Sequence, residues 1–291
     1  MQDNSGIVLA IARRRAKVLH AGKIIETIIE RKFAKLIPGD HVRLENKKIV
    51  SVDKRKNQLM RSYNQRSKEI VANLDHLLLV TAPPPLFNLN VIDRTIALAS
   101  VEEIPFSIIL NKVDLEHQAI LDTIQYYKSM GIKVLRAEAK NKGGCIEIFD
   151  FLENSSAKAI ALSGISGVGK SSIVSQIFGD IDLRTNEVSE KTGQGRQTTS
   201  NVHGYDYQGS KVIYDVPGVQ NFGLSHLEYE NLRFYFSDFI SHAKNCEYRS
   251  CLHLQEPNCG IKAAISSGAL LSSRHENYQQ IMSEIDFAKP Y

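Results

Sequence analysis

Short apolar stretches separated by turn residues make up the first part of the chain. They lie at residues 7–12, 16–19, 23–29, 41–44 and 48–52, with turn residues at 21–22 and 38–40. Five short strands with so few residues between them are typical of a small β-barrel, and the open face of such barrels often binds oligonucleotides. The pattern therefore predicts an N-terminal OB-fold β-barrel over residues 1–68.

The pattern changes at residue 72, where stretches of strand and helix begin to alternate. The predicted strands are 75–80, 105–110, 132–135, 159–162, 202–207 and 211–214, and the predicted helices are 89–101, 146–152 and 172–178. Such alternation gives a largely parallel sheet with helices on both faces and ligands at the carboxyl ends of the strands. We therefore predict a central α/β domain over residues 69–222.

Helical spacing dominates the remainder of the chain, and we predict a mainly helical domain over residues 223–291. It is interrupted by four zinc-type ligands with the spacing C-x4-C-x-H-x5-C, which are Cys246, Cys251, His253 and Cys259. Three thiolates and one imidazole fill a tetrahedral zinc site and leave no open position, which favours a structural metal over a catalytic one. The alternative is a set of unrelated buried cysteines.

Basic residues are concentrated at the N-terminal end of the chain. The formal net charge is +4, but residues 1–68 hold 17 Lys and Arg against 6 Asp and Glu, and the other residues carry a balance of −7. A basic face, including Arg61 just beyond the barrel strands, suits sequence-independent binding of nucleic acid backbones. A solvated basic surface explains the charge equally well, because charge runs are usually exposed faces.

No stretch of the sequence has the length and composition of a membrane span. The apolar run at residues 6–12 is only seven residues long, and arginines follow it instead of preceding it, which argues against a signal peptide. The hydrophobic content of 43% and the charged content of 23% are those of a soluble globular protein. We expect a cytoplasmic monomer without a membrane partner.

A phosphate-binding loop joins one predicted strand to the helix that follows it. The sequence GISGVGKSS at residues 164–172 fits the pattern G-x-x-x-x-G-K-[ST]. Backbone N–H groups of such a loop bind phosphate oxygens, while Lys170 reaches the β and γ phosphates and the Ser171 hydroxyl binds Mg²⁺. The predicted nucleotide-binding residues here are Gly164, Ile165, Ser166, Gly167, Val168, Gly169, Lys170, Ser171 and Ser172.

The sequence NKVD at residues 111–114 directly follows a predicted strand and is typical of guanine recognition. The Asp114 carboxylate accepts hydrogen bonds from N1–H and the 2-amino group of guanine, whereas adenine offers neither donor. Asn111 is expected to hold the loop and touch the base, and the stem of Lys112 to cover the face of the base. The predicted nucleotide is therefore GTP or GDP.

A second base-contacting loop is predicted after the strand at residues 132–135. The sequence RAEAK at residues 136–140 places the backbone N–H of Ala139 where it meets the guanine O6 atom. A plain loop between a strand and a helix accounts for these residues nearly as well, so both interpretations stay open.

The polar stretch EVSEKTGQGRQTTS at residues 187–200 has no apolar periodicity and is typical of a switch segment. Its Thr198 and Thr199 are candidates for the threonine that meets Mg²⁺ and the γ phosphate. The sequence DVPG ends the last predicted strand, so Asp215 is expected to hold Mg²⁺ through water and the Gly218 N–H to sense the γ phosphate. The predicted magnesium ligands are Ser171, Thr199 and Asp215.

The residue that orients the attacking water is not in its usual place. Many GTPases have a glutamine directly after D-x-x-G, where this chain has Val219, which cannot hydrogen-bond water. We therefore predict slow intrinsic hydrolysis and assign the role to Gln197, with Gln220 as the alternative. The predicted catalytic residues are Lys170, Gln197, Thr199 and Gly218.

The motifs stand in an unusual order along the chain. A guanine-nucleotide domain normally runs from the phosphate loop through the switch threonine and D-x-x-G to N-K-x-D and the last base loop. Here N-K-x-D and the base loop come first. Each motif still lies between a strand and a helix, so the same sheet is formed with its chain ends moved. The sequence therefore predicts a circularly permuted P-loop GTPase domain.

With these motifs the chain resembles the ribosome small-subunit-dependent GTPases, which are circularly permuted. The resemblance rests on PGDHV, NKVD, GISGVGKSS, GQGRQTTS, DVPGVQNFGL and the C-x4-C-x-H-x5-C cluster, all in the order of the family. Two positions depart from the family pattern: Gln197 replaces a common histidine before the switch threonines, and Glu138 replaces a serine before the alanine of the base loop.

The resemblance implies a GTPase that acts late in maturation of the small ribosomal subunit and is released when the subunit stimulates hydrolysis. Its partners would be the subunit and its rRNA, contacted by the flanking domains, and its cofactors GTP or GDP, Mg²⁺ and one structural Zn²⁺. The alternative is a GTP-switched RNA-binding chaperone or checkpoint protein whose hydrolysis is incidental. A third interpretation, a P-loop ATPase acting on a small molecule, conflicts with Asp114.

Overall fold

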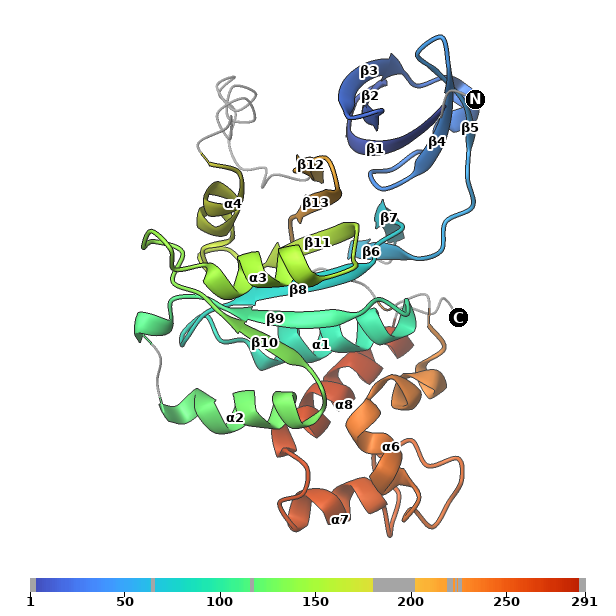
Figure 1. Ribbon diagram of the computed structural model, residues 1–291. Helices are drawn as coiled ribbons and strands as arrows, with labels where there is room; N and C mark the ends of the chain where they lie inside the picture. The colour runs from blue at the N-terminus through green and yellow to red at the C-terminus, as the bar shows by residue number, and fades with distance from the viewer. Residues whose placement is uncertain are drawn as a thin grey trace, which may run out of the picture.

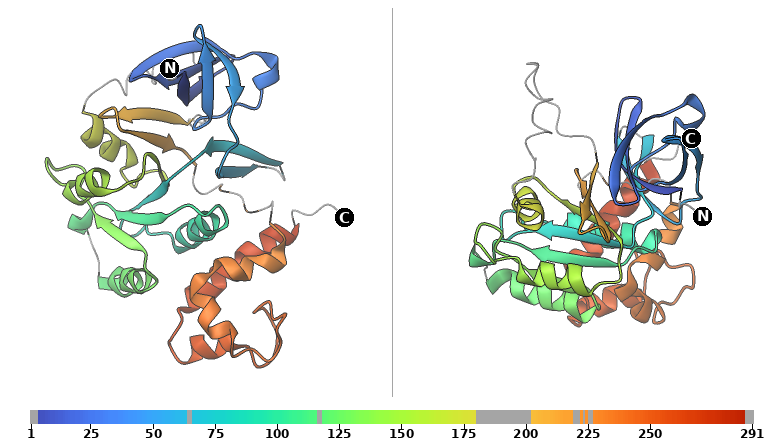
Figure 2. Two further views of the ribbon diagram at one scale, coloured as in Figure 1. Left: turned by 45° about the vertical axis from the view of Figure 1, so that its right-hand side comes forward. Right: turned by 45° about the horizontal axis from the view of Figure 1, so that its top comes forward.

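The computed structural model describes residues 4–63, 66–115, 118–179, 202–218, 222, 224 and 227–287. In Figures 1 and 2 the N-terminal barrel and the C-terminal helices lie at opposite ends of the molecule, with the central sheet between them. Among the described residues, no helix is both long enough and apolar enough to cross a membrane.

The N-terminal segment forms five antiparallel strands at the predicted places. They are β1 (Ser5–Ala12), β2 (Arg15–His20), β3 (Lys23–Ile28), β4 (His41–Glu45) and β5 (Lys48–Val52), with the 3₁₀ turn η1 (Arg31–Phe33) after β3. Strand β1 pairs with β2 and β4, β2 pairs with β3, and β4 pairs with β5. Since β3 also approaches β5, the five strands curl around a small apolar core of their own.

A hairpin that the sequence analysis did not predict follows the barrel. Its strands are β6 (Gln58–Tyr63) and β7 (Arg66–Ala72), which pair in antiparallel register. Figure 1 shows the hairpin between the barrel and the central sheet. The proposed domain boundary at residues 68/69 lies within β7.

The central domain has the predicted alternation of strands and helices. Its elements are β8 (His76–Thr81), α1 (Leu89–Val101), β9 (Phe106–Leu110), η2 (Val113–Leu115), α2 (Gln118–Ser129), β10 (Lys133–Arg136), α3 (Ile146–Asn154), β11 (Ala159–Gly164), α4 (Lys170–Phe178), β12 (His203–Tyr207) and β13 (Lys211–Val216). The strand order is β10-β9-β8-β11-β13-β12, and all neighbours are parallel except β12 and β13. Because β8, β11, β9 and β13 run in one direction, the loops that follow them meet at one edge.

Alternate residues of the central strands face two different apolar cores. In β8, Leu77 and Leu79 pack with helix α1, whereas Leu78 and Val80 pack with helices α3 and α4. Apolar residues on both faces of a strand are what a sheet covered by helices on both sides requires. The sheet does not end at β12, because β1 of the barrel pairs with β12 at Ala10 and His203 and joins the two sheets.

The C-terminal segment consists of helices, as predicted. They are η5 (Tyr229–Tyr235), α6 (Ser237–Ala243), α7 (Gly260–Ser266) and α8 (Ser272–Phe287). Helix α8 packs along α1, so the C-terminal segment covers the face of the central sheet opposite α3 and α4. Residues of α1, α6 and α8 share one continuous apolar core with the sheet.

A buried ion network joins the C-terminal helices to the central domain. The Arg274 guanidinium of α8 is 1% exposed and lies 2.7 Å from Asp93 of α1 and 2.6 Å from Asp238 of α6. The contact with Asp238 is bidentate, whereas the contact with Asp93 is an ion pair without the geometry of a directed hydrogen bond. Tyr127 and Asn277 complete the network by hydrogen bonds to Asp93.

Replacing Arg274 by alanine is expected to lower the free energy of unfolding by about 3 to 5 kcal/mol, because it leaves two buried carboxylates without their cation. Urea unfolding followed by circular dichroism measures the change. The matched control is Arg15→Ala, whose ion pair with Glu26 is largely exposed and is expected to contribute almost nothing. Equal effects of the two substitutions would contradict the role given to the buried network.

Candidate functional site

The phosphate-binding loop occupies the predicted place between β11 and α4. Strand β11 ends at Gly164 and helix α4 begins at Lys170, so the N-terminal N–H groups of α4 point toward the space enclosed by the loop. Gly169 caps the helix with a φ angle of 92°, and a Cβ atom there would lie 2.3 Å from Asn111 Nδ2. Both the backbone conformation and the close approach of Asn111 therefore require glycine.

The NKVD residues lie against this loop, although more than fifty residues separate them along the chain. The Asn111 amide is buried and donates from Nδ2 to the carbonyl of Val168 at 2.8 Å. Lys112 Nζ donates to the carbonyl of Gly167 at 2.8 Å. Asp114 follows in the turn η2 with an exposed side chain. The loop that we assign to the base is thus fastened to the loop that we assign to the phosphates.

The third predicted loop meets the same residues. The backbone N–H of Ala139 donates to Asn111 Oδ1 at 3.0 Å, and the carbonyl of Ala139 accepts from Gln176 of helix α4 at 3.3 Å. Asn111 therefore bridges all three loops with one amide group. The contact of the Ala139 N–H with guanine O6 stays a prediction.

The end of β13 brings Asp215 and Gly218 to the phosphate side of the site. Asp215 pairs in register with Leu162 of β11, and its carboxylate forms an ion pair with the Lys170 ammonium. The Ser163 hydroxyl donates to the carbonyl of Val216 at 3.0 Å and fixes the two strand ends together. Gly218 follows with a φ angle of 74°. The structure thus gathers Asn111, Lys170, Asp215 and Gly218 at one edge of the sheet.

Some of the predicted residues lie outside the part of the chain that the structure describes. They are Gln197, Thr198, Thr199, Val219 and Gln220. Among the P-loop residues, Ile165 is half-buried, Ser166 and Ser171 are exposed and Val168 is fully buried beneath the loop. Ser172 lies one residue further along α4 and is half-buried.

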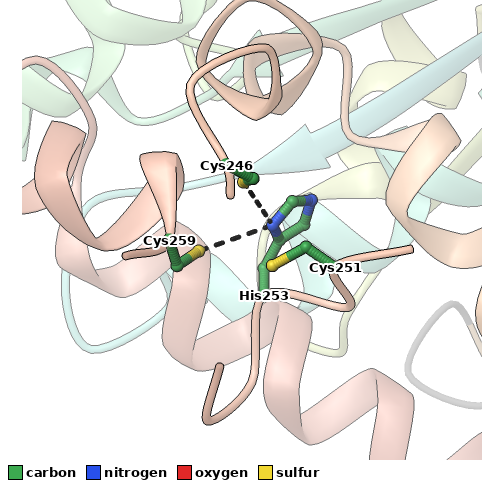
Figure 3. A group of neighbouring side chains, drawn as sticks. All are labelled: Cys246, Cys251, His253 and Cys259. Atoms are coloured by element: carbon green, nitrogen blue, oxygen red, sulfur yellow. Dashed lines mark hydrogen bonds between the residues drawn. The ribbon is translucent and has the colours of Figure 1, made fainter. Parts of the chain in front are cut away.

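The four predicted zinc ligands come together at one point of the C-terminal segment. Their donor atoms all lie within 4.8 Å of one another, and Figure 3 shows the side chains pointing toward a common centre. His253 Nδ1 lies 3.6 Å from Cys246 Sγ and 3.5 Å from Cys259 Sγ. Cys251 and Cys259 are buried, and none of the four cysteines of the chain forms a disulfide.

This cluster fits a tetrahedral zinc ion. Donor atoms about 2.0 to 2.3 Å from zinc are separated by roughly 3.5 to 3.8 Å when they occupy the corners of a tetrahedron. Burial lowers the pKa of His253 to about 4, so its imidazole is neutral and has a free electron pair at neutral pH. Burial raises the pKa of Cys251 to about 12, so metal binding must displace the proton of this thiol.

The fold and the site define a circularly permuted P-loop GTPase, since N-K-x-D, the phosphate loop and D-x-x-G follow β9, β11 and β13 of one sheet in that chain order. A family model described as RsgA GTPase matches residues 52–225. The "Small ribosomal subunit biogenesis GTPase RsgA" of Borreliella afzelii is 35% identical over 98% of this chain and 95% of its own length. The chain belongs to the RsgA GTPase family.

Two solved structures share the whole architecture. "YjeQ from Thermotoga maritima" is 27% identical, with a TM-score of 0.73 over 97% of this chain and 98% of the other. "YloQ, a circularly permuted GTPase" is 26% identical, with a TM-score of 0.70 over 99% of this chain and 96% of the other. The prediction of a circularly permuted GTPase domain from the order of the motifs is therefore confirmed.

One residue near the site was assigned elsewhere by the sequence analysis. Arg61 belongs to the basic face predicted just beyond the barrel strands, but its guanidinium lies against Gly218 of the D-x-x-G loop. The apolar positions of the β6–β7 hairpin, such as Leu59 and Val71, are the signal that was available. They belong to two short apolar groups, residues 59–60 and 70–72, which do not alternate with polar residues as the positions of a half-buried strand do.

Proposed function

We propose that this protein is a GTPase of small ribosomal subunit biogenesis that binds the subunit with GTP and leaves it after hydrolysis. The observation that carries the proposal is the Asn111 side chain, which joins its own loop and the Ala139 loop to the phosphate loop. The domain that contains these loops lies between a basic barrel and a metal-binding segment in the chain. Relatives named for small ribosomal subunit biogenesis match nearly the full chain, which supports the same partner here. A ribosomal partner implies a cytoplasmic protein, and we propose that it acts as a monomer.

In this proposal each loop has one task toward GTP. Asp114 reads the guanine, Asn111 holds the base loop, and Lys170 leaves Asp215 to neutralise the β and γ phosphates. Mg²⁺ would be held by Ser171, Thr199 and, through water, Asp215, and would supply positive charge that stabilises the phosphate oxygens. Gly218 would sense the γ phosphate with its N–H group. Gln197 would orient the attacking water when the subunit is bound.

We propose further that the N-terminal barrel is an OB-fold that binds rRNA. Its pairing scheme, with β1 between β2 and β4 and with β3 close to β5, is that of a five-stranded Greek-key barrel. A groove of about 370 Å³ beside η1 is lined by Arg31, Lys32, Phe33 and Lys35. The Lys32 ammonium lies 5.0 Å from the Phe33 ring centroid. Phe33 is half-buried against the barrel core, and cations beside such a ring suit a phosphate backbone with one base at the rim of the groove.

The four-ligand cluster is proposed to bind one structural zinc ion. With no open coordination position, the ion would fix the loop between α6 and α7 and take no part in hydrolysis. We also propose three domains, with residues 1–68 as the barrel, 69–222 as the GTPase domain and 223–291 as the zinc domain; the first of these boundaries cuts β7, so the β6–β7 hairpin spans it.

Measuring GTP hydrolysis with and without purified small subunits tests the proposal. We expect slow turnover alone and stimulation of about 10²-fold or more, because GTPases with a misplaced catalytic residue depend on a partner to complete the site. Exchanging Arg31, Lys32 and Lys35 for glutamate is expected to abolish stimulation at low subunit concentration and to leave the unstimulated rate unchanged. Absence of any stimulation of the wild-type protein would contradict the ribosomal function while leaving the GTPase activity intact.

The alternative function is an RNA-binding checkpoint protein whose slow hydrolysis is incidental. The basic groove beside η1 fits this function as well, because it would bind RNA whether or not GTP is cleaved. The two functions differ in the behaviour of a Ser171→Ala variant. A GTPase whose hydrolysis releases it stays bound to the subunit when Ser171 is lost, whereas a checkpoint protein with incidental hydrolysis dissociates at an unchanged rate.

A further inference from the structure

The Arg61 guanidinium occupies a position beside the γ-phosphate sensor of the proposed site. A Cβ atom built on Gly218 would lie 2.5 Å from Arg61 Nη2 and 3.0 Å from Arg61 Cζ. The guanidinium therefore packs against the Cα atom of Gly218, the glycine that ends the D-x-x-G sequence. Arg61 itself belongs to β6, more than 150 residues earlier in the chain.

The backbone around Arg61 directs its side chain toward the phosphate end of this loop. Arg61 forms an isolated antiparallel bridge with Phe222, which lies four residues after Gly218. Its Cα is thus aligned with Phe222 while its guanidinium reaches Gly218, so the side chain runs back along the loop toward the end of β13. At that end lie Asp215 and Lys170.

The charges at this edge of the sheet leave a role for another cation. Lys170 and Asp215 form an ion pair, so together they add no net charge to the phosphate site. In GTP hydrolysis the water oxygen bonds to the γ phosphorus, the bond to the β,γ-bridging oxygen breaks with its electron pair passing to GDP, and the proton lost by the water passes to the released phosphate or to the solvent. Negative charge gathers on the γ-phosphoryl oxygens and the bridging oxygen, where a guanidinium is a strong stabiliser.

We propose that Arg61 is a catalytic residue that contacts the γ-phosphoryl group of GTP and acts as an arginine finger supplied by the chain itself. This proposal rests on the placement of the γ phosphate at Gly218 given under the proposed function. The planar guanidinium binds two phosphate oxygens at once, which an ammonium group does not.

The hairpin that carries Arg61 is fastened to the barrel. The Ala72 N–H at the end of β7 donates to the carbonyl of Pro38 at 2.9 Å, and Asn73 Nδ2 donates to the carbonyl of Gly39 at 2.8 Å. Arg55 forms ion pairs with Asp40 of the same barrel turn and with Glu69 of β7, at 2.6 and 2.7 Å. These contacts attach the hairpin that carries Arg61 directly to the barrel that we propose to bind RNA.

The test compares Arg61→Ala and Arg61→Lys with Lys68→Ala, which removes one positive charge from the opposite strand of the same hairpin. Three quantities are measured: the single-turnover rate of GTP hydrolysis with saturating small subunits, the affinity for GDP, and the affinity for GDP with aluminium fluoride, an analogue of the transition state. For Arg61→Ala we expect the rate to fall about 10³-fold and the aluminium fluoride complex to be lost, with GDP affinity unchanged.

The other variants separate charge from geometry and from folding. Arg61→Lys is expected to keep less than about a tenth of the wild-type rate, because it retains the charge without the planar fork. Lys68→Ala is expected to hydrolyse GTP at the wild-type rate. A wild-type rate in Arg61→Ala would overturn the proposal, and so would a fall in GDP affinity parallel to the fall in rate, which indicates a structural role. A wild-type protein without hydrolysis would overturn the proposed function itself.

Discussion

Exchanging Asp114 for asparagine is expected to weaken GTP binding by about 10³- to 10⁴-fold and to make xanthosine triphosphate the preferred nucleotide. The carboxylate accepts two hydrogen bonds from guanine, and an amide opposes one of these donors with a donor of its own. Xanthine has a carbonyl oxygen at position 2, which accepts from the new amide. Competition of both nucleotides against a fluorescent GDP analogue measures the change in preference.

The control for this substitution is Asp122→Asn on the exposed side of helix α2, which removes the same charge away from the loops. It is expected to leave nucleotide affinity unchanged. Since Asn111 ties the base loop to the phosphate loop, the Asp114 variant should keep its fold and its thermal midpoint. Retention of GTP binding within a few-fold of the wild-type value would contradict the assignment of the NKVD loop to guanine.

Removing the metal from the C-terminal cluster is expected to unfold the segment from the start of α6 to the end of α7. Binding of a structural zinc ion contributes on the order of 10 kcal/mol to the folding of small metal domains. The segment contains only the short helices α6 and α7 beside the cluster, and helices of seven residues are not stable alone. Loss of helical circular dichroism on addition of a chelator, with nucleotide binding retained, is the expected result.

A pair of cysteine variants provides the control. Cys251→Ala removes a predicted ligand, whereas Cys145→Ala removes a buried cysteine that packs in the core of the central sheet. We expect about one zinc ion per chain in the wild type and in Cys145→Ala, and little or none in Cys251→Ala. Equal zinc contents in the two variants would show that the cluster is not the metal site.

The sequence was informative wherever a residue type has a local cause. A strand followed by a glycine loop and a lysine predicts the phosphate loop. Backbone N–H groups bind the phosphate oxygens there, and glycine is needed because a side chain would keep the backbone away from the phosphates. Burial is the local cause for the regular elements. It sets the period at which apolar residues recur, and this period predicted the five barrel strands, the parallel sheet and helix α1. The spacing of the four metal ligands depends only on the geometry of one ion.

Contacts between distant segments could not be read in this way. The Arg274 network joins three helices through residues that look like ordinary exposed charges in the sequence, and the position of Arg61 at Gly218 depends on how a hairpin crosses the central domain. The role of Asn111 was predicted only in part. Its sequence motif indicates the base, but the two residues that its side chain hydrogen-bonds, Val168 and Ala139, lie in two other loops.

The pairing of β1 with β12 also bears on the edge of the central sheet. Strand β12 stands at the border of the central sheet, and an uncovered strand of this kind offers its N–H and C=O groups to any other extended chain. The first strand of the barrel pairs with this border at His203, and Tyr214 adds a hydrogen bond to the carbonyl of Val8 across the junction. The module proposed to bind RNA thus occupies part of a strand edge that would otherwise be open to pairing with another extended chain.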